Sequence, residues 1–188
     1  TIQFSLPMRF ILLHGCGGET MEMNWFPYAK TELEKMGHEV IARTFPDNFK
    51  ARRNIWIPFL RDELKPNENS ILIGHSSGAV ATMRYTEENR IKGSVLVGAH
   101  CTHLDDENEK QSGYFDGPWN WDAIKANQDF ILQFASTDDP YIPVENSRHI
   151  HTNLSTIYFE FSDKGHFGGG DRTMETFPEL IEELKKFI

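Results

Sequence analysis

Three residues far apart in the chain, Ser76, Asp139 and His166, carry the side chains that nucleophilic catalysis requires. A serine hydroxyl is a poor nucleophile at neutral pH, so it needs a base within hydrogen-bond reach, and that base needs a third group to fix its tautomer. We predict that Ser76 is the nucleophile, His166 the base and Asp139 the acid that orients the imidazole. Such a trio can cleave an ester or an amide through an acyl-serine intermediate.

Ser76 is the centre of a Gly-x-Ser-x-Gly pattern that begins at Gly74 and ends at Gly78. Residues 71–73 form an uncharged apolar run typical of a strand buried on both faces, and apolar residues recur at helical spacing after Ser77. The glycines leave room for a sharp strand-to-helix turn, which resembles the nucleophile elbow of α/β-hydrolases. The alternative interpretation is an ordinary turn in which Ser76 only caps the helix.

The acid and the base both have competitors nearby. Asp138 and Asp139 are neighbours, so in an extended loop only one of them can face the imidazole. Asp139 is preferred because it begins Asp-Pro-Tyr-Ile-Pro, which looks like the acid loop of α/β-hydrolases, and Asp138 is expected to cap the turn. Among the eight histidines, His166 alone follows the last predicted strand and is flanked by glycines that let its ring reach inward.

The other histidines have simpler expected roles. His75 is expected to pack against the sheet and His14 to orient the glycine-rich loop in which it lies. The rest are expected at the edge of the site or on the surface: His38, His100, His103, His149 and His151. No Cys/His or His-Glu-x-x-His spacing accompanies them, so we expect no metal site.

Short apolar segments alternate with amphipathic ones along the chain. The predicted strands are residues 9–13, 38–44, 71–73, 93–98, 129–135 and 156–161, and the predicted helices are 25–36, 54–64, 77–86, 119–126, 144–153 and 177–187. Within 54–64, Pro58 is expected in the first turn. This alternation predicts an α/β fold, a compact α/β-hydrolase with a mostly parallel six-stranded sheet, helices on both faces and no large lid, in one domain over residues 1–188.

A glycine-rich loop, residues 14–18, follows the first predicted strand. Such a loop can present backbone N–H groups at the carboxyl edge of a parallel sheet, where ligands bind. We predict that the N–H groups of Ser77 and Cys16 hold the oxyanion of the reacting carbonyl. A phosphate cradle is the rival interpretation, but the loop lacks both phosphate-binding glycine patterns.

The long polar segment 99–118 lacks apolar periodicity and is expected to be a functional excursion. An aromatic-walled substrate pocket is predicted from residues in and beyond this segment: Tyr114, Phe115, Trp119, Trp121 and Phe167. The alternative for Trp119 and Trp121 is that they only cover the core.

Composition excludes several classes of function. The chain has 188 residues and a net charge of -9, and it shows no clustered basic face, so we expect no nucleic-acid partner. The apolar run 10–13 is too short to span a membrane, so no membrane association is expected. Two cysteines, Cys16 and Cys101, and no visible secretory leader favour a cytoplasmic setting, with nuclear access left open.

Longer blocks of sequence carry a more specific resemblance. They are residues 73–79, 83–85, 106–109, 112–115, 118–121, 125–127, 136–140 and 165–167. Through these blocks the chain resembles, almost from end to end, the serine hydrolases named after retinoblastoma-binding protein 9. Matched residue by residue, that resemblance implies a triad of Ser76, Asp139 and His166.

The resemblance also implies a protein partner, because the family is named for retinoblastoma binding through a Leu-x-Cys-x-Glu motif. The matching positions here begin at Leu64 and end at Glu68, with Pro66 in place of the cysteine. Proline removes an N–H and fixes φ, so we do not expect this chain to bind the retinoblastoma protein.

The sequence therefore predicts a serine hydrolase that acts on a small carboxylic ester or amide, including aminoacyl substrates, and needs no cofactor. One alternative is a non-catalytic interaction module that keeps the fold, because a fold alone does not determine function. Another is transfer of the acyl group to an acceptor other than water.

Overall fold

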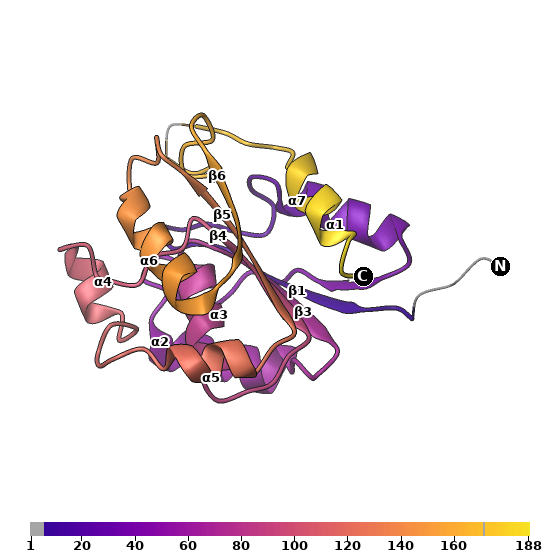
Figure 1. Ribbon diagram of the computed structural model, residues 1–188, viewed down its shortest axis with the longest axis horizontal. Helices are drawn as coiled ribbons and strands as arrows, with labels where there is room; N and C mark the ends of the chain where they lie inside the picture. The colour runs from indigo at the N-terminus through magenta and orange to yellow at the C-terminus, as the bar shows by residue number, and fades with distance from the viewer. Residues whose placement is uncertain (1–5, 171) are drawn as a thin grey trace.

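The chain is described from a computed structural model, which covers residues 6–170 and 172–188 (Figure 1). Within these residues, six strands form one sheet: β1 (Arg9–Leu13), β2 (Glu39–Ile41), β3 (Ser70–His75), β4 (Gly93–Val97), β5 (Phe130–Ser136) and β6 (Ile157–Phe161). The strand order is β2-β1-β3-β4-β5-β6, and every neighbouring pair is parallel. The predicted parallel six-stranded sheet is confirmed.

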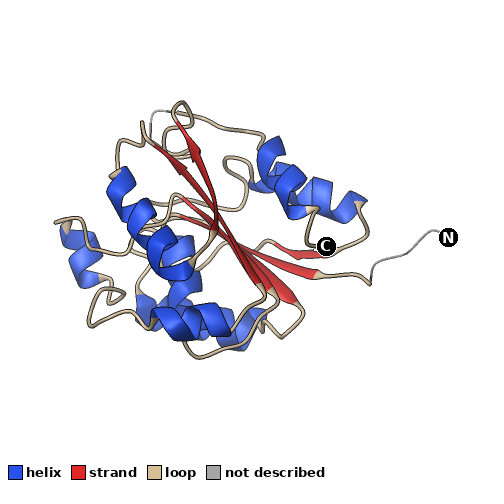
Figure 2. Cartoon of the chain, viewed as in Figure 1, coloured by secondary structure: helices blue, strands red, loops and turns tan. Residues whose placement is uncertain are grey.

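Helices cover both faces of this sheet, as predicted (Figure 2). On one face, α1 (Phe26–Lys35) and α7 (Pro178–Leu184) lie side by side (Figure 1). The other face is covered by α2 (Arg53–Pro58), α3 (Ser77–Thr86), α5 (Trp121–Ala126) and α6 (Val144–Leu154).

The core is divided between these two faces because successive side chains of a strand point in opposite directions. In β3, Ile71 and Ile73 pack in the cluster beneath α1 and α7, whereas Leu72 packs in the cluster beneath α2 and α3. All six residues of β3 are buried. A strand buried on both faces reads as a continuous apolar run, which is why the sequence identifies β3 clearly.

The segment predicted as one helix over 54–64 is instead two elements. Helix α2 ends at Pro58, and residues 59–64 continue as a π-helix, η1 (Phe59–Leu64). The prediction that Pro58 lies in the first turn is wrong. Proline has no N–H, and its ring clashes with the carbonyl four residues earlier, so the α-helical ladder cannot continue past it unchanged.

The polar segment 99–118 contains a short helix that the sequence analysis did not predict, α4 (Glu107–Gln111). Its N-cap is Asp106, whose carboxylate accepts a hydrogen bond from the Glu109 amide at 3.0 Å. An acidic first turn, with Glu107 and Glu109, is favourable at the positive end of a helix. Local capping, rather than apolar periodicity, therefore specifies this element.

The strand order reverses direction between β1 and β3. From β1 the chain crosses to β2 on one side, and it then returns to place β3 on the other side of β1. In open parallel sheets, ligands bind outside the carboxyl ends of the strands at such a switch point. The loops after β1 and β3 meet there, and they carry the glycine-rich loop and Ser76.

Candidate active site

Ser76 lies in the sharp turn that the sequence predicts. Strand β3 ends at His75, helix α3 begins at Ser77, and Ser76 itself has φ 56° and ψ -118°. A Cβ atom added at Gly74 would lie 2.5 Å from the Gly78 carbonyl oxygen, and one at Gly78 would collide with the Leu13 carbonyl oxygen. Glycine is therefore required on both sides of the turn. A non-glycine residue in such a conformation is strained, and that strain is typical of functional sites.

His166 is paired with Asp139. Their side chains are 9% and 3% exposed, and Nδ1 of His166 lies 2.7 Å from Oδ2 of Asp139. The other carboxylate oxygen of Asp139 accepts the backbone N–H groups of Tyr141, at 2.8 Å, and Ile142, at 3.0 Å. Because Nδ1 faces a carboxylate it carries the proton, which leaves Nε2 as the basic nitrogen.

Burial sets the charge of this histidine. It lowers the pKa of His166, while the hydrogen bond to Asp139 acts in the opposite direction. The ring is therefore neutral at neutral pH and able to accept a proton on Nε2.

Asp138 does not face the imidazole. Its carboxylate accepts hydrogen bonds from Ser136 Oγ at 2.6 Å and from the Gly165 amide at 2.8 Å, and it pairs with Arg172 at 3.0 Å. Gly165 directly precedes His166, so Asp138 holds the loop after β5 against the loop that carries the base.

Ser76 and His166 line one cavity of about 500 Å³. The segment 99–118 contributes five residues to its wall: His100, Leu104, Asp106, Asn108 and Glu109. His100 lies at the wall with Nε2 3.2 Å from a Glu109 carboxylate oxygen, whereas His103 is half exposed and is not among the lining residues. The structure thus places the predicted nucleophile and base around one cavity, with Asp139 behind the base. Their catalytic roles remain a prediction.

The predicted aromatic wall lies elsewhere, since none of its five residues is among those lining the cavity. Tyr114 and Phe167 are fully buried in the core, and Phe115, Trp119 and Trp121 pack against it. Trp119 is held there by the Arg84 guanidinium, 3.6 Å from its ring centroid. The alternative, that the two tryptophans cover core, therefore describes the structure.

A different aromatic residue lies at the site. Tyr141 is 52% exposed, lines the cavity, and its ring centroid lies 5.2 Å from that of His166. The sequence analysis missed it, although its place two residues after Asp139 in the acid loop is a usable signal.

The amides of the loop after β1 differ in whether they already have an acceptor. The amides of Gly17 and Gly18 donate to the carbonyls of Phe49 and Asn48 at 3.0 and 3.1 Å, and the Gly15 amide donates to a Glu19 carboxylate oxygen. The Cys16 amide has no acceptor among the described residues. Ser77, the first residue of α3, also has an N–H without an intrahelical partner. Neither of the two predicted oxyanion donors, the amides of Cys16 and Ser77, has a backbone acceptor among the described residues.

His14 fixes the start of this loop, as expected. Its Nε2 accepts the Phe45 amide at 2.9 Å, and its Nδ1 donates to the Gly15 carbonyl at 2.7 Å. One nitrogen accepts and the other donates, so the ring is neutral. Burial lowers the pKa of His14, in agreement with this.

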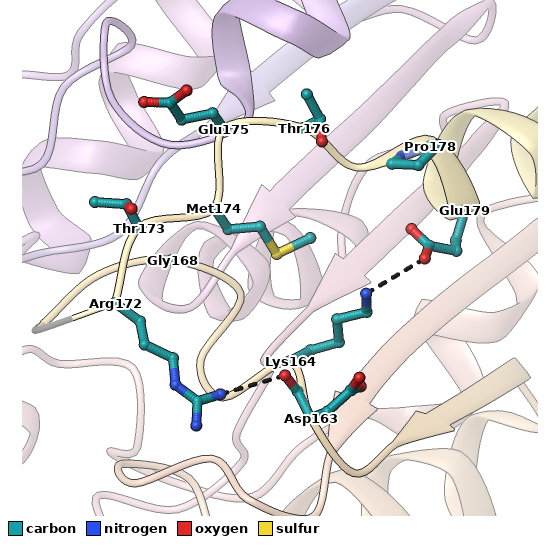
Figure 3. Close-up of a pocket in the computed structure, with 10 residues that line it drawn as sticks. All are labelled: Asp163, Lys164, Gly168, Arg172, Thr173, Met174, Glu175, Thr176, Pro178 and Glu179. Carbon is teal, nitrogen blue, oxygen red and sulfur yellow. Dashed lines mark hydrogen bonds and ion pairs between the residues drawn. The ribbon is translucent and has the colours of Figure 1, made fainter.

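A second hollow, of about 360 Å³, lies along the loop between β6 and α7 (Figure 3). Its basic side chains are already engaged: Lys164 pairs with Glu179 at 3.4 Å, and Arg172 donates to the Asp163 carbonyl at 3.3 Å. None of the ten residues that line it is a triad residue. It provides no chemistry comparable to that of the first cavity.

Two other observations concern the described part of the chain. Across residues 6–170 and 172–188, no helix is long and apolar enough to cross a membrane. In the same residues, no three His, Cys, Asp or Glu side chains are grouped so that they could hold a metal ion.

Comparison with known proteins agrees with this geometry. A family model described as Serine hydrolase matches residues 10–186. The serine hydrolase RBBP9 of Rattus norvegicus is 39% identical over 184 residues, which cover 97% of this chain and 96% of that protein.

Solved structures show the same fold at lower identity. The ydeN gene product of Bacillus subtilis superposes with a TM-score of 0.85 at 21% identity, covering 96% of this chain and 98% of that one. A Pyrococcus furiosus esterase gives a TM-score of 0.60 at 18% identity, covering 98% and 83%. The α/β-hydrolase fold and the predicted family are both confirmed, and the chain belongs to the RBBP9 family of serine hydrolases.

Proposed function

We propose that this hydrolase cleaves a small carboxylic ester or amide through an acyl-serine intermediate, with Ser76, His166 and Asp139 as its triad. The observation that carries the proposal is the position of His166. Its ring is held by Asp139 at 2.7 Å and lines the same cavity as the strained Ser76. A nucleophile, a base and an orienting acid are the parts that acyl transfer requires.

In the proposed reaction, the substrate carbonyl lies over Ser76 with its oxygen directed to the N–H groups of Ser77 and Cys16. Nε2 of His166 takes the hydroxyl proton as Ser76 Oγ attacks the carbonyl carbon. The tetrahedral oxyanion is stabilised by the two amides and by the positive end of α3. His166 then protonates the leaving group, and the C–O or C–N bond breaks.

The second half of the reaction repeats these steps with water. His166 removes a proton from a water molecule that attacks the acyl-serine, and the proton returns to Ser76 Oγ as the acid product leaves. Asp139 keeps its charge throughout and stabilises the imidazolium that forms in both halves. The Cys16 amide supports this proposal, because it has no acceptor among the described residues, whereas the amides of Gly15, Gly17 and Gly18 do.

The charge of the cavity favours substrates that carry an amine. Its wall includes the carboxylates of Asp106 and Glu109, and no lysine or arginine among the described residues lines it. A cationic group is attracted into a cleft lined by negative charge. We therefore include aminoacyl esters and amides in the proposed substrate class.

A panel of fluorogenic acyl and aminoacyl esters and amides tests this proposal, with Ser76→Ala as the blank. We expect turnover that the substitution abolishes and higher kcat/KM for aminoacyl members than for neutral acyl members of the same size. No turnover across the panel would favour the non-catalytic alternative. Products formed with added alcohol or amine in place of the free acid would indicate acyl transfer.

A further inference from the structure

A buried acid and a buried histidine lie beside the triad and take no part in the proton transfers described for it. Glu19 and His75 are 8% and 1% exposed. Oε1 of Glu19 lies 3.4 Å from Nδ1 of His75. Neither residue was singled out from the sequence for a role in the chemistry. A buried carboxylate is costly unless it is paired, so this contact needs an explanation.

The surroundings of His75 favour a charged ring. Its Nε2 lies 2.7 Å from the backbone carbonyl oxygen of His166, and a carbonyl only accepts hydrogen bonds, so Nε2 carries a proton. Its Nδ1 lies 3.4 Å from a Glu19 carboxylate oxygen, which is an ion-pair distance, and has no partner in hydrogen-bond geometry within the described residues. A carboxylate at ion-pair distance stabilises a second proton on Nδ1, and the ring is then an imidazolium.

The carboxylate of Glu19 is bound to the loop after β1. It accepts the Gly15 amide and, at 2.5 Å, the side-chain amide of Asn24. His75 in turn is bound to the carbonyl of His166 in the loop after β6. The pair thus connects the loop of the proposed oxyanion donor to the loop of the proposed base, through one charged contact.

We propose that Glu19 and His75 form a positioning ion pair, which joins these two loops and places a fixed positive charge beside the catalytic base so that His166 stays neutral. This inference rests on the proposed function, because it assumes that His166 is the base. Neither residue acts on substrate in this account. Each acts through His166 and through the backbone of the oxyanion loop.

The charges around the two rings support this role. The ring centroids of His75 and His166 are 4.9 Å apart, so a charge on both rings is unfavourable. Burial opposes the charge on His75, but Glu19 and the His166 carbonyl outweigh it and raise the pKa of His75. Burial, and then the charge of His75, lower the pKa of His166 against the effect of Asp139.

Other titratable groups also face these rings. His14 lies near His75 and Glu19 from the start of the loop after β1, and His100 and Tyr141 lie near His166 from the loops after β4 and β5. His14 is held neutral by its two hydrogen bonds. His100 contacts the carboxylate of Glu109, whose side chain is 16% exposed. The contact between His75 and Glu19 joins two side chains that are both less than 10% exposed.

The substitution Glu19→Gln tests the proposal, with 4-nitrophenyl acetate as substrate. It removes the charge that keeps His75 protonated while an amide oxygen can still accept the Gly15 N–H. Neutral His75 no longer repels a charge on His166, so the acid limb of the kcat/KM profile should move to higher pH. We expect a loss of roughly tenfold on the acid side, and less than about threefold on the alkaline plateau.

Asn24→Gly is the matched control. Asn24 has φ 52°, which glycine adopts freely, and its loss removes a hydrogen bond from the same carboxylate without removing a charge. We expect the kcat/KM of this variant to fall by the same factor at every pH. The acid limb of its pH profile should stay where it is in the native protein. The proposal would be overturned if the acid limb of Glu19→Gln stayed at the native pH, or if the acid limb of Asn24→Gly moved by the same amount as that of Glu19→Gln.

A spectroscopic measurement separates this inference from the proposed function. Nitrogen NMR of histidine-labelled protein should show both ring nitrogens of His75 protonated in the native protein and in Ser76→Ala, and one nitrogen deprotonated in Glu19→Gln. A neutral His75 ring in the native protein refutes the ion pair, whatever the activity. Turnover that survives Ser76→Ala refutes the proposed function and leaves the ion pair standing.

Discussion

Gly98 directly follows β4, has φ 59°, and leaves the space in which the His166 ring lies. A Cβ atom at this position would be 3.2 Å from Cε1 and 3.3 Å from Nδ1 of His166, and 3.9 Å from Oδ2 of Asp139. Carbon atoms prefer separations of about 3.5–4.0 Å. Gly98→Ala would therefore push the ring by a few tenths of an ångström at the nitrogen that bonds Asp139.

The expected effect has two parts. An alanine in the left-handed region costs about 1–2 kcal/mol, which should appear as reduced stability in urea unfolding. Displacement of the base should lower kcat/KM further, because a misplacement of about 1 Å can cost roughly a hundredfold and a smaller one correspondingly less. We expect a loss of about tenfold, measured with the best fluorogenic ester under conditions in which the variant is folded.

Gly37→Ala is the control for the backbone strain. Gly37 has φ 88°, and an added Cβ would meet no atom within 4 Å. Its alanine variant should lose comparable stability and keep wild-type kcat/KM. Wild-type activity in folded Gly98→Ala, or an equal loss of activity in Gly37→Ala, would refute the reasoning that the absent side chain at Gly98 positions the base.

Three further predictions concern the acid and the base. Asp139→Asn should lower kcat by roughly three to four orders of magnitude, because the amide no longer holds the productive tautomer; a loss below tenfold would point to another acid. Asp138→Ala should lower kcat by about tenfold with little change in KM, since the Gly165 amide loses its acceptor. Because burial lowers the pKa of His166 and the protonated ring is inactive, kcat/KM should stay level as pH falls through 6.5 and drop only below it. A profile that already declines above 6.5 would contradict this.

The sequence predicts the framework of the site because each part of it has a local signal. Strand β3 reads as an apolar run since it is buried on both faces, and the glycines at 74 and 78 are required by the close passage of α3. Parallel strands end at one edge, so the order of the loops brings Asp139 and His166 to the same side as Ser76. These inferences need no knowledge of distant contacts.

What the sequence could not predict depends on contacts between distant segments. The sequence leaves open whether Trp119 lines the pocket or covers the core. It lies against Arg84, a residue of α3 whose side chain also donates to the carbonyls of Tyr114 and Pro118. Composition shows that an aromatic residue is present, and not which surface it covers. Only the fold places Arg84 between this segment and the core.

The pair of Glu19 and His75 is a second case of this kind. Glu19 lies in a loop with no pattern that shows its carboxylate turning inward, and His75 reads only as a buried strand residue. The contact forms because β1 and β3 are neighbours, with Leu13 opposite Gly74 in the register of the sheet. The contact between Glu19 and His75 can be inferred once that register is known.

The most direct test of the central claim is the site of covalent labelling by a fluorophosphonate probe, located by peptide mass spectrometry. We expect the adduct on Ser76 in the native protein, no labelling of Ser76→Ala, and labelling slowed by orders of magnitude in His166→Ala. Labelling of Ser76→Ala at the native rate, or an adduct on another residue of the native protein, would contradict the assignment of Ser76 as the nucleophile.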